Sequence, residues 1–90
     1  MVQVIWLPEA LAELDLIRSY VGEFDPIAAD RLVNRLADAG NSLGAFPNRG
    51  RPATNGRREL VTVPPYLLRY IVAGRIVYIT GIKHSAREPD

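Results

Sequence analysis

The 90-residue sequence contains no cysteine, a single tryptophan and a single histidine. Without thiols, neither disulfides nor thiolate metal sites can stabilise the fold, so the hydrophobic core must do so alone or with a partner. No segment approaches the roughly 18 consecutive apolar residues that a membrane-spanning helix requires. The N-terminus lacks the basic start of a signal peptide. We therefore expect a cytoplasmic protein without membrane contacts, and we expect neither a metal nor a cofactor.

The composition is that of a folded protein. Apolar residues make up 48% of the chain and charged residues 23%, proportions that are typical of globular domains rather than of disordered chains. A chain this short buries only about 60 to 65% of the surface that its unfolded form exposes. The sequence therefore predicts one domain over residues 1–90 with one modest core.

Charge is distributed unevenly along the chain, although its formal net charge is only +1. Residues 1–46 carry seven acidic and three basic side chains, a charge of −4, whereas residues 47–90 carry eight basic and three acidic ones, a charge of +5. Seven of those eight basic residues are arginine, which binds phosphates and carboxylates through a planar pair of donors. This asymmetry predicts an acidic or polyanionic partner for the C-terminal half. The alternative is that the arginines only solvate one face of a sheet.

The N-terminal half is expected to form one strand and two helices. Residues 2–7 alternate and are rich in β-branched and aromatic side chains, as strands are. Pro8 then suits the first position of a helix that continues to Val21, because its missing N–H is not needed there. Asp25 followed by Pro26 is a second helix start, and an apolar stripe continues from it to Leu43. The short connection between the helices predicts an antiparallel hairpin.

The C-terminal half is expected to begin with a ten-residue irregular loop, PNRGRPATNG. Three strands follow, RRELVTV, YLLRYIV and RIVYITGIK, and the last two form a hairpin. The predicted fold class is therefore α+β with the order β-α-α-β-β-β, in which a helical hairpin covers one face of a small, mostly antiparallel sheet. The other face is expected to stay partly open, with Arg69 on it between two apolar neighbours.

An ordered pattern covers nearly the whole chain, from about Trp6 to Pro89. The pattern A.LDLI.SYV......AA.RLV..L......L..FP..GR, leading into RELV.V.PYLLRYIV....VYI.GI.H..R.P, resembles the RelE/ParE superfamily of bacterial type II toxins. The resemblance implies the same β-α-α-β-β-β architecture. It also implies a hetero-oligomer with a cognate antitoxin, usually an acidic and partly disordered chain that folds as it binds.

Two activities occur in that superfamily. RelE-like members cut messenger RNA on the ribosome, whereas ParE-like members inhibit DNA gyrase and are not known to hydrolyse anything. RNA cleavage by 2'-hydroxyl attack needs a proton acceptor, a proton donor and fixed positive charge. The RelE-like enzymes supply these with clustered lysines and arginines and a C-terminal tyrosine, or with a glutamate, an arginine and a His-Tyr pair. Here Ser85 follows His84, no tyrosine follows it, and the nearest substitutes are Glu59, Arg58, Arg69 and His84.

The resemblance therefore favours the ParE-like branch, through GRREL, PYLLRY and the terminal residues His84, Arg87 and Pro89. DNA gyrase is then the expected target, and the ribosome with its messenger RNA is the alternative. A domain without toxic activity, or a nucleic-acid-binding module, is a third possibility. If the chain is a ribonuclease, the expected catalytic residues are Arg58, Arg69, His84 and Arg87. The residues expected to bind the antitoxin or the target are Arg49, Arg51, Arg57, Arg58, Arg69, Lys83, His84 and Arg87.

Three interpretations of His84 stay open at this point. It is a strand-end histidine held by a carbonyl or an acid, a proton-transfer group, or a partner contact. Tyr66, Tyr70 and Tyr78 are expected to pack in the core with hydrated hydroxyl groups. Trp6 is expected to anchor the core rather than to stack on a base.

Overall fold

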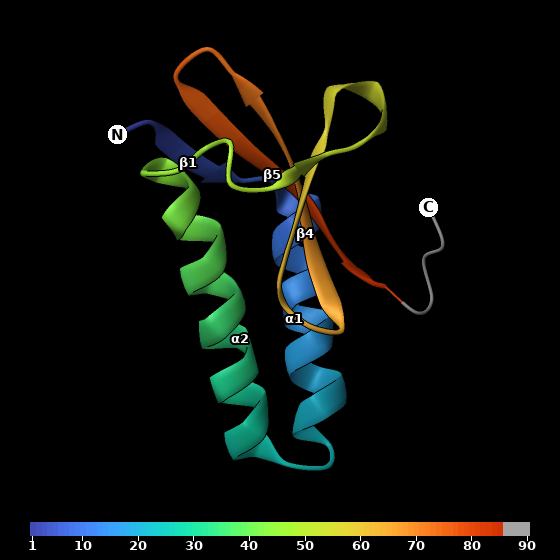
Figure 1. The fold of residues 1–90 in the computed structure, drawn as a ribbon. Coiled ribbons are helices and arrows are strands. Elements are labelled where there is room, and N and C mark those ends of the chain that lie inside the picture. Colours follow the sequence, from blue (N-terminus) through green and yellow to red (C-terminus); the bar gives the residue numbers. More distant parts are fainter. Residues whose placement is uncertain (86–90) are drawn as a thin grey trace.

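The computed structural model describes residues 1–85, so Arg87 lies outside the described residues. Two helices pack side by side on one face of a five-stranded sheet (Figure 1). The elements are β1 (Gln3–Trp6), α1 (Pro8–Gly22), α2 (Pro26–Asn41), the 3-10 helix η1 (Ser42–Gly44), β2 (Arg51–Pro52), the 3-10 helix η2 (Thr54–Gly56), β3 (Arg58–Val63), β4 (Tyr66–Ala73) and β5 (Ile76–His84).

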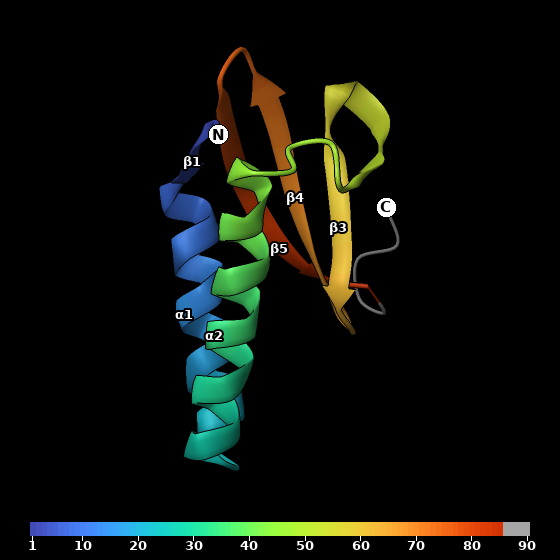
Figure 2. The same cartoon turned by 60° about the vertical axis from the view of Figure 1, so that its left-hand side comes forward.

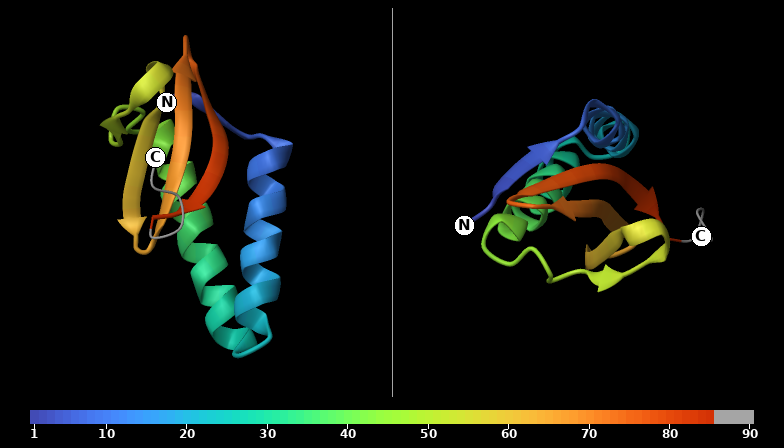
Figure 3. Two further views of the ribbon diagram at one scale, coloured as in Figure 1. Left: turned by 90° about the vertical axis from the view of Figure 1, so that its right-hand side faces the viewer. Right: turned by 90° about the horizontal axis from the view of Figure 1, so that it is seen from above.

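The sheet has the strand order β1-β5-β4-β3-β2. Among the strand pairs of residues 1–85, β1 and β5 are parallel and the three other pairs are antiparallel. Figure 2 shows the helices on one side of the sheet, with the hairpin extending beyond it, and Figure 3 shows β1 lying beside β5. The predicted α+β class and the mostly antiparallel sheet are confirmed.

Local sequence signals account for both helix starts. Pro8 is the first residue of α1, after an extended Leu7. The Asp25 carboxylate accepts a hydrogen bond from the Ala28 N–H at 3.1 Å at the start of α2, and a cap of this kind satisfies one of the amides that a helix start leaves without a partner. Arg18 and Asp30 then form an ion pair between the two helices.

The core lies between α2 and the central strands. The stripe of α2 buries Val33, Leu36 and Ala39, and Leu43 follows it in η1. Trp6 packs against this core, as expected, and its indole N–H donates to the Asn41 side-chain oxygen at 3.0 Å. From the sheet, the core receives Leu60, Val63, Leu68, Tyr70, Val77, Ile79 and Ile82.

Three expectations need correction. The ten-residue segment from Pro47 to Gly56 is not wholly irregular, because it contains β2 and η2. The spacing of Leu11, Leu14, Ile17 and Val21 predicts an apolar stripe on α1, but Leu11 is 47% exposed and Ala10 alone is buried in this helix. The Tyr70 hydroxyl is not hydrated, because it is bonded to the backbone of a loop. Propensity and periodicity do not encode such pairings between distant segments.

Candidate functional site

The arginine loop, residues 47–57, is anchored at the centre of the sheet. Tyr70 is fully buried in β4. Its hydroxyl donates to the Pro47 carbonyl at 2.8 Å and accepts from the Gly50 N–H at 2.7 Å. The loop backbone is therefore held in place by a core residue rather than only by its own turns.

Arg58 holds the same loop from β3. One guanidinium nitrogen, Nη1, donates to the Gly50 carbonyl at 2.6 Å and lies 3.4 Å from the Asn48 carbonyl. These bonds hold one guanidinium nitrogen on the loop backbone, so the geometry gives Arg58 a positioning role. Arg57, at the end of the loop, makes a long contact of 3.5 Å from its Nε to the Thr54 carbonyl.

An apolar and a cationic side chain stand at the start of this loop. Phe46 is 65% exposed, although it is a large hydrophobic residue. Arg49 is also exposed, and its Nη1 donates to the Ser42 hydroxyl at 2.8 Å. Phe46, Pro47 and Arg49 contribute to a hollow of about 610 Å³. Exposed aromatic and arginine side chains are typical anchors of protein interfaces.

A row of alternating charges crosses the sheet face that points away from the helices. Glu59 pairs in register with Arg51 of β2 and with Arg69 of β4. Its two carboxylate oxygens accept from the Arg51 Nη2 at 3.3 Å and from the Arg69 Nε at 3.2 Å. The Glu59 and Arg69 side chains are only 14% and 12% exposed, whereas Arg51 is 62% exposed. The pair formed by Arg69 is therefore largely shielded from water, and the pair formed by Arg51 is not.

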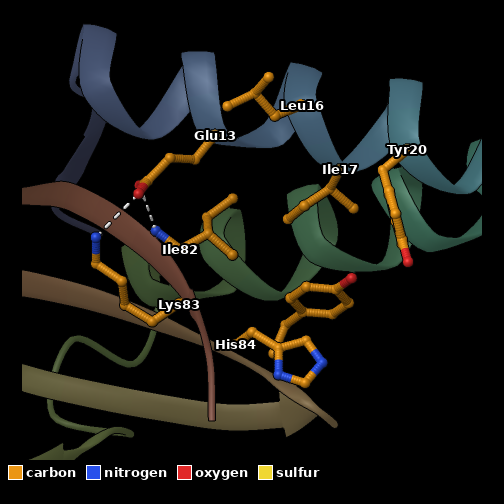
Figure 4. A pocket seen from close by; sticks show the side chains of 8 residues that line it. Glu13, Leu16, Ile17, Tyr20, Ile82, Lys83 and His84 are labelled. Atoms are coloured by element: carbon orange, nitrogen blue, oxygen red, sulfur yellow. Dashed lines mark hydrogen bonds and ion pairs between the residues drawn. The ribbon is translucent and has the colours of Figure 1, made fainter. Parts of the chain in front are cut away.

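A second hollow lies between α1 and the end of β5, and it has a volume of about 360 Å³ (Figure 4). The Glu13 carboxylate lies at one end of it. One oxygen accepts from the Ile82 backbone N–H at 2.8 Å and the other from the Lys83 Nζ at 2.9 Å. We call this arrangement the Glu13 clasp. The hollow is lined by Glu13, Leu16, Ile17, Tyr20, Tyr66, Ile82, Lys83 and His84.

His84 borders this second hollow and contacts an aromatic ring. Its imidazole packs edge to face on Tyr66, with the ring centroids 5.3 Å apart. The two residues pair in register across β4 and β5. The register between β4 and β5 shifts between Arg69 and Tyr70. Because of this shift, Ile82 and His84 lie on the same face of the sheet as the core residue Ile79. His84 therefore lies on the helix side of the sheet.

Among the residues that the structure describes, Arg58, Arg69 and His84 are not brought together at one site. Arg58 pairs in register with Tyr70 and shares its face, whereas Arg69 points to the opposite face. Position 84 pairs with Tyr66, four residues along β4 from Tyr70, which is roughly 13 Å at the usual rise of a strand. Arg51 and Arg69 meet at Glu59 on the outer face, whereas the Lys83 ammonium reaches Glu13 of α1. Arg49, Arg57 and Arg58 belong to the arginine loop or follow its end.

Two structurally important residues were not predicted from the sequence. Nothing in the spacing of the first helix indicates that Glu13 reaches a strand 69 residues later. Tyr70 was assigned to the core, but its two loop bonds were not foreseen. Among residues 1–85 no cluster of three or more histidine, cysteine, aspartate or glutamate side chains could hold a metal ion. No helix in that range is long and apolar enough to span a membrane.

Residues 4–89 match the family described as the ParE toxin of the type II toxin-antitoxin system parDE. The chain belongs to the ParE toxin family. It is 53% identical over 87 residues to Toxin RelE2 of Caulobacter vibrioides, a match that covers 97% of this chain and 99% of that toxin. It is also 35% identical over 88 residues to a protein of Sinorhizobium fredii that is named as a toxin, covering 96% of this chain and 91% of that one.

A solved structure shares the fold of this ParE-family chain. A chain of the chromosomal ParDE system from P. aeruginosa superposes with a TM-score of 0.86 at 26% identity, covering 93% of this chain and 96% of that one. The predicted membership of the RelE/ParE superfamily is thus confirmed. The chain is a toxin of the type II toxin-antitoxin class.

Proposed function

We propose that this ParE-family toxin acts in the cytoplasm by binding and inhibiting DNA gyrase without hydrolysing a substrate, and that a cognate antitoxin neutralises it. The observation that supports a non-enzymatic toxin is the separation of Arg58, Arg69 and His84. Arg58 and Arg69 lie on opposite faces of the sheet. His84 pairs with Tyr66, which is four residues along β4 from Tyr70, the partner of Arg58. A transition state for phosphoryl transfer needs its proton-transfer groups and its cations within hydrogen-bond distance of one phosphate.

The bonds of the arginines support the same proposal. Arg58 binds loop carbonyls, and Arg69 binds the shielded Glu59 carboxylate. A guanidinium has five N–H donors, so these bonds orient each group on a protein acceptor without using all of its donors. We therefore assign these two residues to the support of the arginine loop and the outer face.

The charge and exposure of the arginine loop support an acidic antitoxin. The loop presents Arg49 and Arg51 to solvent next to the exposed Phe46. Cations around an apolar anchor attract an acidic chain at long range and hold it through desolvated contacts. The antitoxin of the proposed complex is expected to carry acidic residues opposite this loop.

A gyrase assay with purified toxin tests the proposal. We expect relaxed or cleaved plasmid to accumulate when gyrase is incubated with the toxin, and messenger RNA in a translating extract to remain uncut. His84→Ala serves as the discriminating variant in the RNA assay, because only the ribonuclease candidate gives this imidazole a proton-transfer role. Expression of the protein from the adjoining reading frame should restore growth. Uninhibited gyrase together with cut messenger RNA would overturn the gyrase proposal.

The second candidate is a ribosome-dependent messenger RNA endonuclease. One observation favours it, namely that a relative with 53% identity carries the name RelE2. In that case His84→Ala should reduce cutting by about 10²- to 10⁴-fold, which is the usual contribution of a general acid or base. The same two assays therefore distinguish the candidates.

A further inference from the structure

Strand β5 is longer than β1, the strand that pairs with its outer edge. β5 has nine residues and β1 has four, and their register ends at the pair Trp6 and Ile79. The chain then turns into α1, with Pro8 as its first residue. Within the part of the chain that the structure describes, residues 80–84 of β5 have no strand on that side.

The Ile82 N–H points toward this uncovered edge. Ile82 pairs in register with Leu68 of β4, yet its N–H donates to Glu13 rather than to β4. Three residues further on, the Ser85 N–H donates to the Pro65 carbonyl, on the β4 side. This alternation is that of an antiparallel pair, in which every second residue turns its backbone groups outward. An outward N–H that no strand carbonyl accepts is the group that an added strand would bind.

In the Glu13 clasp, a carboxylate occupies the place of a strand carbonyl. The oxygen of Glu13 lies 2.8 Å from the Ile82 nitrogen, a normal distance for a sheet hydrogen bond. Gly81 keeps this position accessible, because a Cβ atom there would lie 3.0 Å from the same carboxylate oxygen. The Glu13 side chain is 30% exposed, so solvent and an incoming chain can reach it.

An apolar hollow lies directly beside the uncovered edge. Leu16 and Tyr20 border it from α1, and they are 68% and 53% exposed. Figure 4 shows both side chains, with Ile17, along the helix that faces the end of β5. Side chains of an added strand alternate between the two faces of the sheet. One of them would therefore enter this hollow.

We propose that an extended, acidic peptide segment binds along residues 80–84 of β5 and replaces Glu13 on the Ile82 N–H. A backbone carbonyl of the segment takes the place of the carboxylate, and an apolar side chain fills the hollow between Leu16 and Tyr66. An acidic side chain of the segment replaces Glu13 as the ion-pair partner of Lys83, whose Nζ otherwise lies 2.9 Å from a Glu13 carboxylate oxygen. If the neutralisation proposed above is correct, this segment belongs to the antitoxin.

The chemistry of the edge favours a peptide over the other possible occupants. A nucleic acid lacks the alternating backbone carbonyls and apolar side chains that would bind the Ile82 N–H as a strand does and fill the apolar hollow. The same edge of a second toxin copy would bring two Glu13 carboxylates together. An acidic peptide supplies both the carbonyl for Ile82 and the carboxylate for Lys83. The uncovered edge accommodates about five residues of an extended chain, or roughly 17 Å.

Amide hydrogen exchange at Ile82 tests whether a strand carbonyl replaces the clasp. The probe is the antitoxin expressed from the adjoining reading frame and purified with the toxin. In free Glu13→Ala toxin we expect fast exchange at Ile82, because its acceptor is gone. In the complex of that variant we expect exchange at least about tenfold slower, because the partner carbonyl now binds the amide. Fast exchange at Ile82 in the Glu13→Ala complex would overturn the proposal.

A matched pair of surface substitutions tests the hollow. Leu16→Glu places a charge in it at an exposed position, and we expect antitoxin affinity to fall by at least about tenfold. Ile27→Glu is the control, since Ile27 is 65% exposed at the start of α2 and lies outside the hollow. Its affinity should stay within about twofold of wild type. Equal affinities for the two variants would contradict the proposal.

These measurements distinguish a failure of the proposed neutralisation from a failure of the proposed β5 site. If wild-type toxin forms no complex with the antitoxin, the proposed neutralisation is wrong, and the antitoxin cannot provide the segment that binds β5. If the complex forms but neither Ile82 nor Leu16 responds, only the β5 site is wrong. A toxin dimer that dissociates on Leu16→Glu would instead identify a second copy as the occupant and would also overturn the peptide proposal.

Discussion

The Gly50 N–H donates a hydrogen bond of 2.7 Å to the hydroxyl of Tyr70, a residue 20 positions later in the chain. The same hydroxyl donates to the Pro47 carbonyl. The hydroxyl therefore both donates to and accepts from the backbone of the arginine loop. The ring of Tyr70 is fully buried in the sheet. One side chain therefore joins the core to the segment that presents Arg49 and Arg51.

We expect Tyr70→Phe to destabilise the protein by about 1–3 kcal/mol, because it leaves a buried amide and a carbonyl without their partner. The substitution keeps the ring, so the loss reports the hydroxyl. Urea unfolding measures the change in free energy, and amide exchange at Gly50 should accelerate. Tyr78→Phe, at a half-buried position of β5, is the control. Equal stability of the two variants would show that the loop bonds contribute nothing.

The close approach of the loop to Tyr70 also requires glycine at position 50. A Cβ atom there would lie 2.7 Å from the Tyr70 ring and hydroxyl and 2.9 Å from the Glu59 carbonyl oxygen. Because the ring is buried and cannot move aside, we expect Gly50→Ala to cost about 1–3 kcal/mol, as overpacking does. Gly22→Ala is the matched control, since its Cβ would meet only the Ala29 Cβ at 3.7 Å. Thermal unfolding of both variants measures the difference.

Local signals in the sequence predicted the order of the elements because those signals are strong here. Pro8 and the Asp25-Pro26 pair marked both helix starts, and the Asp25 cap is present in the structure. The apolar stripe of α2 is buried as its spacing required. These features depend on residues within a few positions of one another, and such features are the ones that periodicity and capping rules describe.

The functional geometry could not be predicted in the same way. The Glu13 clasp joins residues about 70 positions apart, and no spacing rule reaches that far. The alternation of β4 placed Arg69 correctly on the outer face, but the shielded Glu59 beside it comes from a different strand. The short pairing of β2 with β3 was missed, because two residues with one proline carry no strand pattern.

The two ion pairs of Glu59 should differ in strength. We expect Glu59→Gln to destabilise the fold by about 2 kcal/mol, because it removes the carboxylate next to the mostly buried Arg69. Arg51→Ala should cost less than about 1 kcal/mol, since that pair is exposed and solvent screens it. Chemical denaturation of the two variants gives the comparison. A larger loss from Arg51→Ala would contradict this ranking.

The exposed arginines of the loop should accelerate binding of the antitoxin rather than stabilise the toxin. We expect the double variant Arg49→Ala, Arg51→Ala to slow association by about tenfold at low salt, because steering by complementary charge acts mainly on the association rate. The difference should shrink above about 0.1 M salt, where screening reaches only about 10 Å.

Arg31→Ala with Arg35→Ala is the matched control for this steering. Both residues are exposed on α2, within the half of the chain whose formal charge is −4. The control removes the same total charge from the toxin, so a general effect of net charge would slow both double variants equally. Stopped-flow mixing with the antitoxin at several salt concentrations separates the two outcomes. If the loop variant alone loses its salt-dependent rate, the acidic partner approaches the arginine loop first.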